Sequence, residues 1–494
     1  MTYPDLETAE QFAASGEYKT MAVSIEIFSD LYTPIGVLRK LKNVSNHCYM
    51  FESAEDAKRW GRYSFLGFEP IMEISCRNKE LRIKDVKGNT QNFQTENPGE
   101  YIRKIVCENK APKIEGLPTF TGGLVGYFSY DYIKYAEPSL KLDARDESHF
   151  RDVDLMLFDQ VIAFDNLRQK IILIVNMPLT GDISREYDHA AERLNQLKEL
   201  IQEGAAAPHV PLKLNGGFRP HFTEEAYCKM VEKAKHYIYE GDIFQVVLSN
   251  RLEAEMEGSI LDVYRVLRST NPSPYMFYFS SNDIEIAGAS PETLVKLEDE
   301  TLHTFPLAGT RKRGETYEED QALEKELLSD EKELAEHNML VDLGRNDIGK
   351  ISRIGTVKLE KYQSIERFSH VMHIGSTVQG QIRKDKDFMD TIEAVLPAGT
   401  LSGAPKIRAC EIINELEDLK RGIYGGAVGY IDFTGNLDTC IAIRMAYAKN
   451  NQVFVCSGAG IVADSVPENE YQECINKAKA VTNAIESAGR GMEE

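Results

Sequence analysis

The stretch FQVVLSNRLEAE, residues 244–255, has the pattern of a long β-strand, because an apolar run passes into alternating polar and apolar residues. Similar runs follow it in groups, often with no helix between them. This grouping favours antiparallel sheets over a doubly wound parallel sheet. The sequence therefore predicts an α+β fold with helices packed outside the sheets. The other strands predicted in this half of the chain are 275–279, 370–382, 427–433 and 452–462.

The first 205 residues are predicted to form a region of their own. They combine short strand-like runs, at 48–53 and 171–177, with one strong helical pattern at 184–202. The next stretch, GAAAPHVPLKLNGGFRP at 204–220, is rich in Gly, Ala and Pro and has no periodicity, so it is interpreted as a linker or a long surface loop. We expect an N-terminal region over 1–205 and a second domain over 219–494.

The charge of the chain limits its partners. Lys and Arg number 57 against 78 Asp and Glu, which gives a formal net charge of −21. This charge argues against nucleic acid or an anionic membrane as the main partner. If the substrate is itself an anion, its site must supply local positive charge. Fixed arginines or a bound metal ion are the obvious sources.

The cysteines and the N-terminus indicate a cytoplasmic protein. No two cysteines form a C-x-x-C pair, and their scatter suggests reduced, mostly buried thiols. The opening residues, MTYPDLETAEQF, are polar and acidic and lack the apolar core of a signal peptide. No apolar run reaches the length of about 18 residues that a membrane span needs. The eight cysteines are Cys48, Cys76, Cys107, Cys228, Cys410, Cys440, Cys456 and Cys474.

The segment PAGTLSGAPK, 397–406, has the composition of a loop that presents backbone N–H groups to an anion. A phosphate loop would need the spacing G-x-x-x-x-G-K-[ST], which Gly399, Gly403 and Lys406 do not give. Two interpretations are left open by these residues. The segment is either an ordinary turn or a loop that binds another kind of anion.

Two predicted helices carry paired glutamates. Glu333 and Glu336 lie three residues apart and hence on one helix face, and Glu470 and Glu473 repeat this spacing. A single pair of this kind is usually solvated helix surface. Two pairs near glycine-rich loops are better explained by a shared cation site, and carboxylates without His or Cys suit Mg²⁺.

His370, His373 and Arg444 are the other candidate functional residues. The two histidines lie three apart on a predicted strand, so their side chains face opposite sides and a shared zinc ion is disfavoured. One histidine could act alone as a base, or could simply be packed in the core. Arg444 is a lone charge in an apolar strand, and a substrate carboxylate would be a suitable partner for it.

Six long motifs, in this order along the chain, resemble those of the chorismate-utilising enzymes. The resemblance runs from about residue 219 to 480, and FESAEDAKRWGRYSFLG at 51–67 with NPSPYMFY at 271–278 narrows it to the members that form anthranilate. It then covers nearly the whole chain from about residue 5. The fold it implies is a sandwich of mostly antiparallel sheets with helices outside. The six motifs are PLAGTRKRG (306–314), DEKELAEHNMLVDLGRND (330–347), RFSHVMHI (367–374), PAGTLSGAPKIRA (397–409), IYGGAVGY (423–430) and CSGAGIVADSVPENEYQE (456–473).

The resemblance assigns the anion and its ligands. It implies that the loop binds a carboxylate of chorismate through Thr400, and that Glu336 and Glu473 hold Mg²⁺ with Glu333 and Glu470 in support. It also implies that the pyruvyl carboxylate is held by Arg444, Tyr424 and the backbone at Gly460. The full set of implied substrate contacts is Gly309, Thr310, Thr400, Tyr424, Arg444, Gly458 and Gly460.

The resemblance also implies a two-step reaction. Ammonia attacks ring carbon C2 while the C4 hydroxyl leaves, and Glu292 matches the acid that protonates this leaving group. Its pKa should be raised in a closed site rich in carboxylates. His373 matches the base for the later loss of pyruvate. Gln245 and Thr310 complete the implied catalytic set.

Two substitutions bear on the branch of the family. Relatives that make isochorismate or salicylate have a water-activating lysine where this chain has Gln245, and relatives that make aminodeoxychorismate typically have a lysine in place of Ala308. The absence of both lysines favours the anthranilate-forming members. Aminodeoxychorismate formation is the alternative within the family.

The sequence also bears on the source of ammonia and on two unrelated functions. No cysteine lies in a G-x-C-x-G context, so the resemblance implies that a separate glutamine amidotransferase subunit supplies ammonia. A nucleotide-binding P-loop protein is disfavoured by the loop spacing. A non-catalytic amino-acid sensor on this fold is disfavoured because the matched catalytic residues are all retained.

The resemblance finally implies feedback inhibition by tryptophan at the first committed step of its synthesis. The implied site joins two segments about 220 residues apart. A carboxylate for the ammonium group, polar groups for the carboxylate and an apolar wall for indole make sense of its residue types. The implied effector residues are Glu52, Ser53, Arg62, Pro274, Tyr275 and Met276.

Overall fold

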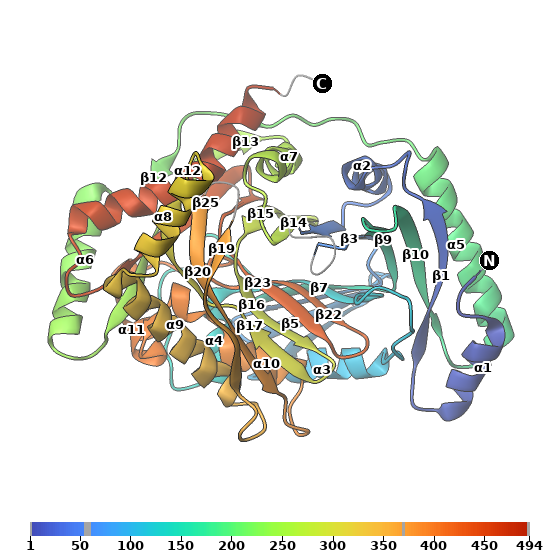
Figure 1. The fold of residues 1–494 in the computed structure, drawn as a ribbon. Coiled ribbons are helices and arrows are strands. Elements are labelled where there is room, and N and C mark those ends of the chain that lie inside the picture. The colour runs from blue at the N-terminus through green and yellow to red at the C-terminus, as the bar shows by residue number, and fades with distance from the viewer. Residues whose placement is uncertain (1, 54–60, 368–370, 492–494) are drawn as a thin grey trace.

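A computed structural model describes residues 2–53, 61–367 and 371–491 of the chain. Two large sheets lie face to face, with helices on their outer sides (Figure 1). Every pair of neighbouring strands described in these sheets runs antiparallel, as the ladder between β13 and β25 illustrates. The predicted α+β sandwich is confirmed.

The first sheet combines strands from both ends of the chain. In spatial order its strands are β1 (Thr20–Phe28), β10 (Lys170–Pro178), β9 (Gln160–Asp165), β3 (Tyr63–Phe68), β2 (Cys48–Glu52), β14 (Tyr275–Ser280), β15 (Glu285–Ser290), β24 (Met445–Lys449), β25 (Gln452–Ile461), β13 (Gln245–Glu257) and β11 (Lys213–Leu214), with β12 (Arg219–Pro220) and β21 (Gly403–Ala404) also paired to β13.

The second sheet is built in the same interleaved way. In spatial order its strands are β18 (Leu307–Lys312), β20 (Val371–Gln381), β17 (Thr301–Thr304), β16 (Thr293–Glu298), β23 (Leu437–Ile441), β22 (Ala427–Asp432), β7 (Gly123–Phe128), β8 (Val153–Phe158), β4 (Met72–Arg77), β5 (Glu80–Asp85) and β6 (Thr90–Gln94), with β19 (Lys358–Arg367) paired to β20.

The helices cover the outer faces and ends of the two sheets. They are α1 (Leu6–Ser15), α2 (Pro34–Val44), α3 (Pro98–Glu108), α4 (Ile133–Ala136), α5 (Ile183–Glu203), α6 (Glu224–Tyr239), α7 (Leu261–Thr270), α8 (Tyr317–Leu327), α9 (Glu331–Gly349), α10 (Phe388–Val395), α11 (Lys406–Glu417) and α12 (Pro467–Gly489), with short 3₁₀ turns η1 (Tyr130–Tyr132) and η2 (Gly399–Leu401).

The strands β9 and β10 are apolar on both faces because each face meets a different core. Val161 and Ala163 point into the core between the two sheets, whereas Ile162 and Phe164 point into the core under helices such as α2 and α5. Alternate residues of a strand face opposite sides, so a strand covered on both sides needs apolar residues throughout. The first sheet is therefore the middle layer of this part of the molecule.

The expected boundary between 205 and 219 falls in the connection from α5 to α6. This connection is not a simple loop, because β11 and β12 within it pair with β13. Both sheets also continue across the boundary: β2 pairs with β14, and β7 pairs with β22. The division into an N-terminal region and a catalytic domain stays a prediction about function.

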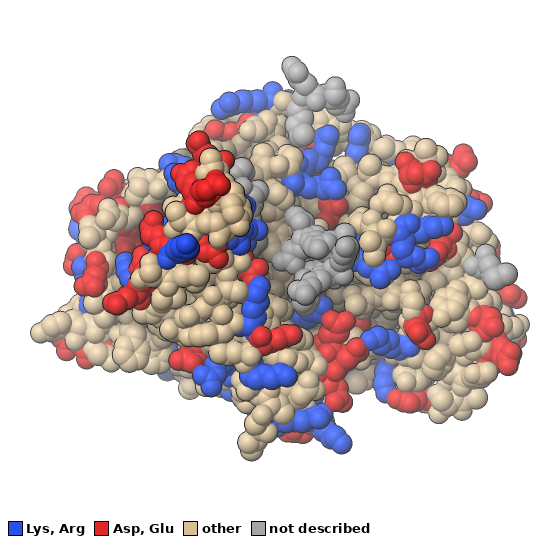
Figure 2. Space-filling model, viewed as in Figure 1, with Lys and Arg blue, Asp and Glu red and all other residues tan. Residues whose placement is uncertain are grey.

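The surface carries charges of both signs (Figure 2), and the cysteines are unpaired. Figure 2 shows acidic and basic side chains intermingled over the face in view. All eight cysteines are unpaired, and most are buried, with Cys107 exposed and Cys228 half-buried. Among the helices that the structure describes, none has the length and apolar character to cross a membrane.

Candidate functional site

His373 lies on β20, opposite Thr310 on the neighbouring strand β18. Its Nδ1 atom is 3.0 Å from the backbone oxygen of Gly309 and 3.0 Å from the Thr310 hydroxyl. Because a carbonyl oxygen only accepts, we assign the proton to Nδ1, which makes Nε2 the basic nitrogen. Burial and the charge of Arg444 lower the pKa of His373, so its ring is neutral at neutral pH. The other candidate histidine, His370, lies outside the described residues.

Glu292 follows β15 and meets the loop 397–406. The Thr400 hydroxyl lies 3.3 and 3.4 Å from the two carboxylate oxygens of Glu292. Burial raises the pKa of Glu292 to about 8, so the carboxyl is mostly protonated at neutral pH. The predicted direction of this pKa shift is confirmed. The closed site raises the pKa as predicted, but the predicted contribution from carboxylates is wrong, because the charge that acts on Glu292 is that of Lys477, which lowers the pKa.

Two glycines of β25 leave room for two predicted side chains. A Cβ atom on Gly458 would lie 3.1 Å from the Tyr424 hydroxyl oxygen, and one on Gly460 would lie 2.5 Å from Nε2 of Gln245. These glycines are two residues apart on the strand and therefore face the same side. Burial raises the pKa of Tyr424 far above the neutral range, so its hydroxyl remains a hydrogen-bond donor. The structure thus brings these four predicted residues together.

The two predicted glutamate pairs come from different layers. Glu336 lies on α9, which packs on β18 and β20 of the second sheet, and Glu473 lies on α12, which packs on β25 of the first. Burial raises the pKa of Glu336, and the carboxylates of Glu333 and Glu473 raise it further. Burial and Glu473 likewise raise the pKa of Glu470. The four carboxylates therefore share one region of negative potential.

This carboxylate region fits a hard divalent cation held in an open site. Within 2–53, 61–367 and 371–491, no three His, Cys, Asp or Glu side chains are grouped closely enough to hold a metal ion by themselves. Mg²⁺ commonly uses one or two protein carboxylates together with waters and substrate oxygens. Glu336 on α9 and Glu473 on α12 suit that mode of binding, because the charge of Glu473 acts on both Glu336 and Glu470.

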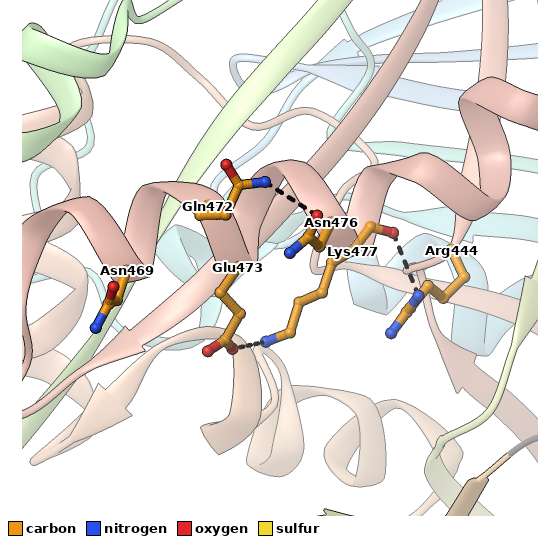
Figure 3. Close-up of a pocket in the computed structure, with 6 residues that line it drawn as sticks. All are labelled: Arg444, Asn469, Gln472, Glu473, Asn476 and Lys477. Carbon is orange, nitrogen blue, oxygen red and sulfur yellow. Dashed lines mark hydrogen bonds and ion pairs between the residues drawn. The ribbon is translucent and has the colours of Figure 1, made fainter. Parts of the chain in front are cut away.

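A pocket of about 380 Å³ opens beside α12. Figure 3 shows that the Lys477 side chain reaches Glu473, while Arg444, beyond Lys477, reaches the backbone oxygen of Lys477. The Nζ atom of Lys477 lies 2.7 Å from Oε1 of Glu473 and 3.1 Å from the backbone oxygen of Gly458. The pocket is lined by Arg444, Asn469, Gln472, Glu473, Asn476 and Lys477.

The environment of Arg444 differs from the one expected from the sequence. The sequence pattern places it in a buried apolar strand, but it lies in the bend between β23 and β24 and its side chain is exposed to the pocket. Its φ angle of 52° is in the left-handed region, which a residue of a regular strand does not adopt. A non-glycine residue held in this conformation is often found at a functional site. One guanidinium nitrogen donates to the Lys477 backbone oxygen at 3.2 Å.

The loop 397–406 uses its lysine and one glycine for structure. The Lys406 ammonium donates to Asp347 on α9 at 2.7 Å and to the Val395 backbone oxygen at 2.8 Å. A Cβ atom on Gly403 would lie 2.2 Å from the backbone oxygen of Gln245, because β21 pairs there with β13. The phosphate-loop interpretation of this lysine therefore has no support in the structure.

A buried ion pair between Arg421 and Glu417 contacts the backbone of the same loop. Arg421 bonds Glu417 at 2.9 Å, the Leu401 backbone oxygen at 2.6 Å and the Val247 backbone oxygen at 2.7 Å. Glu417 in turn accepts from the backbone and hydroxyl of Ser249 at 2.8 and 3.0 Å. A fully bonded buried pair of this kind fixes local geometry. It therefore fixes the backbone next to Thr400.

The segments of the expected effector site meet at the pairing of β2 with β14. Glu52 lies directly opposite Met276 in this pairing. Ser53 follows the end of β2, and Pro274 precedes the start of β14. Two segments more than 200 residues apart in the sequence are thus neighbours in the fold.

The polar groups of this region are engaged within the protein. Glu52 accepts from the Tyr264 hydroxyl at 2.6 Å and from Arg268 at 2.8 Å, both on α7. The Tyr275 hydroxyl donates to an aspartate of β23 at 2.8 Å, and Arg62 pairs with an aspartate of β9 at 2.7 Å. An amino acid that used the Glu52 carboxylate would have to share it with Arg268.

Lys477 was not among the residues predicted from the sequence. It lies four residues after Glu473 on α12, and a Glu followed by a Lys at this spacing usually forms an ion pair on a helix surface. This spacing was the available signal. Arg421 and Glu417, also four residues apart, were missed for the same reason.

Comparison with known proteins agrees with this geometry. The family model of the chorismate binding enzymes matches residues 45–483. The anthranilate synthase component 1 of Acetivibrio thermocellus is 46% identical over 496 residues, covering 99% of each chain. The crystal structure of anthranilate synthase component I from Streptococcus pneumoniae TIGR4 has a TM-score of 0.77 and 39% identity, covering 92% of this chain and 98% of that one.

A more distant relative supports the fold alone. The menaquinone-specific isochorismate synthase of Escherichia coli has a TM-score of 0.70 at 18% identity, covering 97% of this chain and 99% of that chain. With the match to the family model over most of its length and its near full-length similarity to component 1 proteins, the chain belongs to the chorismate binding enzyme family, on its anthranilate synthase component 1 branch.

Proposed function

We propose that this chain is the large subunit of an anthranilate synthase, a lyase that aminates chorismate at C2 and then eliminates pyruvate. The observation that carries the proposal is a protonated carboxyl, Glu292, in the same region as a neutral imidazole, His373. The charge of Lys477 acts on Glu292, that of Arg444 acts on His373, and the Arg444 guanidinium donates to the backbone oxygen of Lys477. Such a pair can supply an acid for one step and a base for another.

In the first step, the nitrogen lone pair of ammonia forms the bond to C2, the ring double bonds shift, and the C4–oxygen bond breaks. The new ammonium group then loses a proton to solvent. Glu292 gives its proton to the departing oxygen, which leaves as water. A carboxyl with a pKa of about 8 holds its proton at neutral pH and yet is acidic enough to transfer it. Thr400, through its bond to Glu292, holds the carboxyl in position.

In the second step, the base removes the proton from C2 and the bond from the ring to the pyruvyl oxygen breaks. The enolate that leaves takes up a proton at its methylene carbon and becomes pyruvate. Nε2 of His373 takes this proton, because Nδ1 is occupied by the Gly309 carbonyl. The electron pair left on the ring completes the aromatic product. Arg444 and the Tyr424 hydroxyl would hold the pyruvyl carboxylate until it leaves.

Glu336 and Glu473 would hold Mg²⁺, with Glu333 and Glu470 behind them. When bound, the metal ion would neutralise and orient the ring carboxylate of chorismate. Glu333 is already paired with Arg311 at 3.3 Å, which suits a supporting residue better than a direct ligand. The metal ion and Arg444 would supply the positive charge that an anionic substrate needs in a protein of net negative charge.

Ammonia would come from a separate glutamine amidotransferase subunit, and the enzyme would work in the cytoplasm. Tryptophan would inhibit it where β2 meets β14, because a ligand there contacts strands from both halves of the chain. Binding at this junction would favour one packing of the strands and so lower the affinity for chorismate.

The test is to incubate the purified chain with chorismate and Mg²⁺, adding either ammonium or glutamine, and to follow anthranilate by its fluorescence. We expect product with ammonium and none with glutamine. Glu292→Gln serves as the matched control, because it keeps the shape of the side chain but holds no transferable proton. Formation of aminodeoxychorismate instead of anthranilate, or efficient use of glutamine by the chain alone, would refute the proposal.

A further inference from the structure

The ammonium group of Lys477 lies inside the carboxylate region that the proposed function gives to Mg²⁺. Its Nζ atom contacts Glu473 at 2.7 Å, and its charge also lowers the pKa values of Glu336 and Glu470. Lys477 therefore acts on carboxylates from both helices. A cation in this position neutralises part of the negative charge of the carboxylates, which a metal ion would otherwise neutralise.

A second contact holds the ammonium near this position. Nζ donates to the Gly458 backbone oxygen at 3.1 Å, and the Lys477 side chain is 39% exposed. A lysine carries a compact charge on a flexible four-carbon stem, so it can exchange one partner without moving its helix. Release of Glu473 would leave the ammonium beside β25, where Gly458 lies next to Tyr424.

From this geometry we propose that Lys477 is a built-in counter-ion of the metal site. When no ion is bound, its ammonium group pairs with Glu473, one of the two carboxylates that would hold Mg²⁺. It must release Glu473 before the ion binds. The inference rests on the proposed function, because Glu473 is a metal ligand only there. Its consequence is that Lys477 weakens the affinity of the free protein for Mg²⁺.

The same exchange would couple metal binding to substrate binding. An ammonium displaced from Glu473 needs a new anionic partner, and the proposed site for the pyruvyl carboxylate lies beside Gly458. Chorismate would therefore stabilise the displaced position of Lys477 and so favour Mg²⁺ binding, and the converse holds by linkage. The lysine is thus a positioning residue that favours binding of metal and substrate together.

The experiment measures Mg²⁺ binding to the full chain by titration calorimetry, without chorismate, in wild type and Lys477→Met. Methionine keeps the length of the side chain and removes its charge. We expect binding to tighten by about tenfold, because both a competing ion pair and the repulsion between two cations are lost. Lys477→Arg retains the charge and should bind Mg²⁺ no more tightly than wild type does.

Lys332→Met is the matched control. Lys332 also lowers the pKa values of Glu336 and Glu470, but no contact with Glu473 is found for it among the described residues. Its loss should tighten Mg²⁺ binding by about threefold or less, and this effect should fade at high salt, because a charge acting from a distance is screened. The effect of Lys477→Met should fade less, because its Nζ atom contacts Glu473 at 2.7 Å, within the screening length of about 3 Å at 1 M salt.

The outcomes separate this inference from the function on which it rests. If Lys477→Met binds Mg²⁺ as wild type does, or only as tightly as Lys332→Met, Lys477 is not the counter-ion. If Lys477→Met gives such a result while wild type makes anthranilate only with Mg²⁺, the role of Lys477 is overturned and the proposed function stands. A wild-type protein that binds no Mg²⁺, with or without chorismate, would overturn the metal assignment as well.

Discussion

Replacing Thr400 by valine should move the alkaline limit of activity to higher pH. The Thr400 hydroxyl donates to the Glu292 carboxylate and therefore stabilises its charged form, which lowers the pKa. Valine has nearly the same shape but no donor. Without the hydrogen bond the charged form is less stable, so the pKa of Glu292 must rise.

The size of this shift follows from the geometry. Burial moves the pKa of Glu292 from 4.5 to about 8, which corresponds to about 5 kcal/mol in favour of the neutral form. A hydrogen bond to a charged group is ordinarily worth about 1.5–3 kcal/mol. The two distances here, 3.3 and 3.4 Å, are long, so we take about 1 kcal/mol. The pKa of Glu292 in Thr400→Val should therefore be higher by about 0.7 units.

The assay is the pH dependence of kcat/KM for chorismate, which reports the pKa of the acid in the free enzyme. Each rate is divided by the concentration of NH₃, because the free-base fraction of ammonium itself rises with pH. Wild type should lose activity above a midpoint near pH 8, since Glu292 must be protonated to act. Thr400→Val should lower the plateau and move this midpoint upward, whereas Thr400→Ser, which keeps the hydroxyl, should leave it in place. An unchanged or lower midpoint in the valine variant, or the same midpoint in Glu292→Gln, would refute the reasoning.

Three further predictions concern the metal, the base and the effector. Glu336→Gln and Glu473→Gln should each weaken Mg²⁺ binding by about tenfold or more, since the ion loses a charged ligand. If titration calorimetry gives a variant near-normal Mg²⁺ affinity, the residue replaced in it is not a metal ligand. His373→Ala should slow pyruvate release by about 100-fold or more while amination continues, so that chromatography shows the aminated, pyruvate-bearing compound; a complete block without it would place His373 in the first step. Ser53→Phe should raise the tryptophan concentration needed for inhibition by about tenfold or more and retain ammonia-dependent activity; equal sensitivity to tryptophan in both proteins would contradict the assigned site.

Much of the fold could be predicted from local patterns. The strand expected at 244–255 is β13 (Gln245–Glu257), and the helix expected at 184–202 is α5 (Ile183–Glu203). Long apolar or alternating runs define such elements because they bury a face. The order of strands in the sheets could not be predicted in this way. The neighbour of β2 is β14, and nothing within either segment indicates that the two would pair.

The site shows the same division between residue type and environment. Carboxylate pairs and a histidine on a strand could be recognised as residue types suited to the chemistry, whereas Gly458 and Gly460 were implied by the family resemblance. Their environment depends on the tertiary structure: burial sets the pKa of Glu292, and a left-handed backbone aims Arg444 into the pocket. Lys477 could not be predicted because a Glu–Lys pair on a helix is ordinary, and the pattern does not show that its charge also acts on a carboxylate of α9.

The loop PAGTLSGAPK, 397–406, shows how these levels combine. Lys406 ties one end of the loop to α9, the helix that carries Glu336, and Gly403 lets its backbone pair with β13 beside Gln245. Arg421 holds the Leu401 carbonyl from the buried side. Thr400 lies between these attachments, so its hydroxyl stays within reach of Glu292 with little freedom to move. The glycine and the lysine that suggest a phosphate loop therefore hold the backbone in place, and the chemistry of this loop is left to the one hydroxyl that they position.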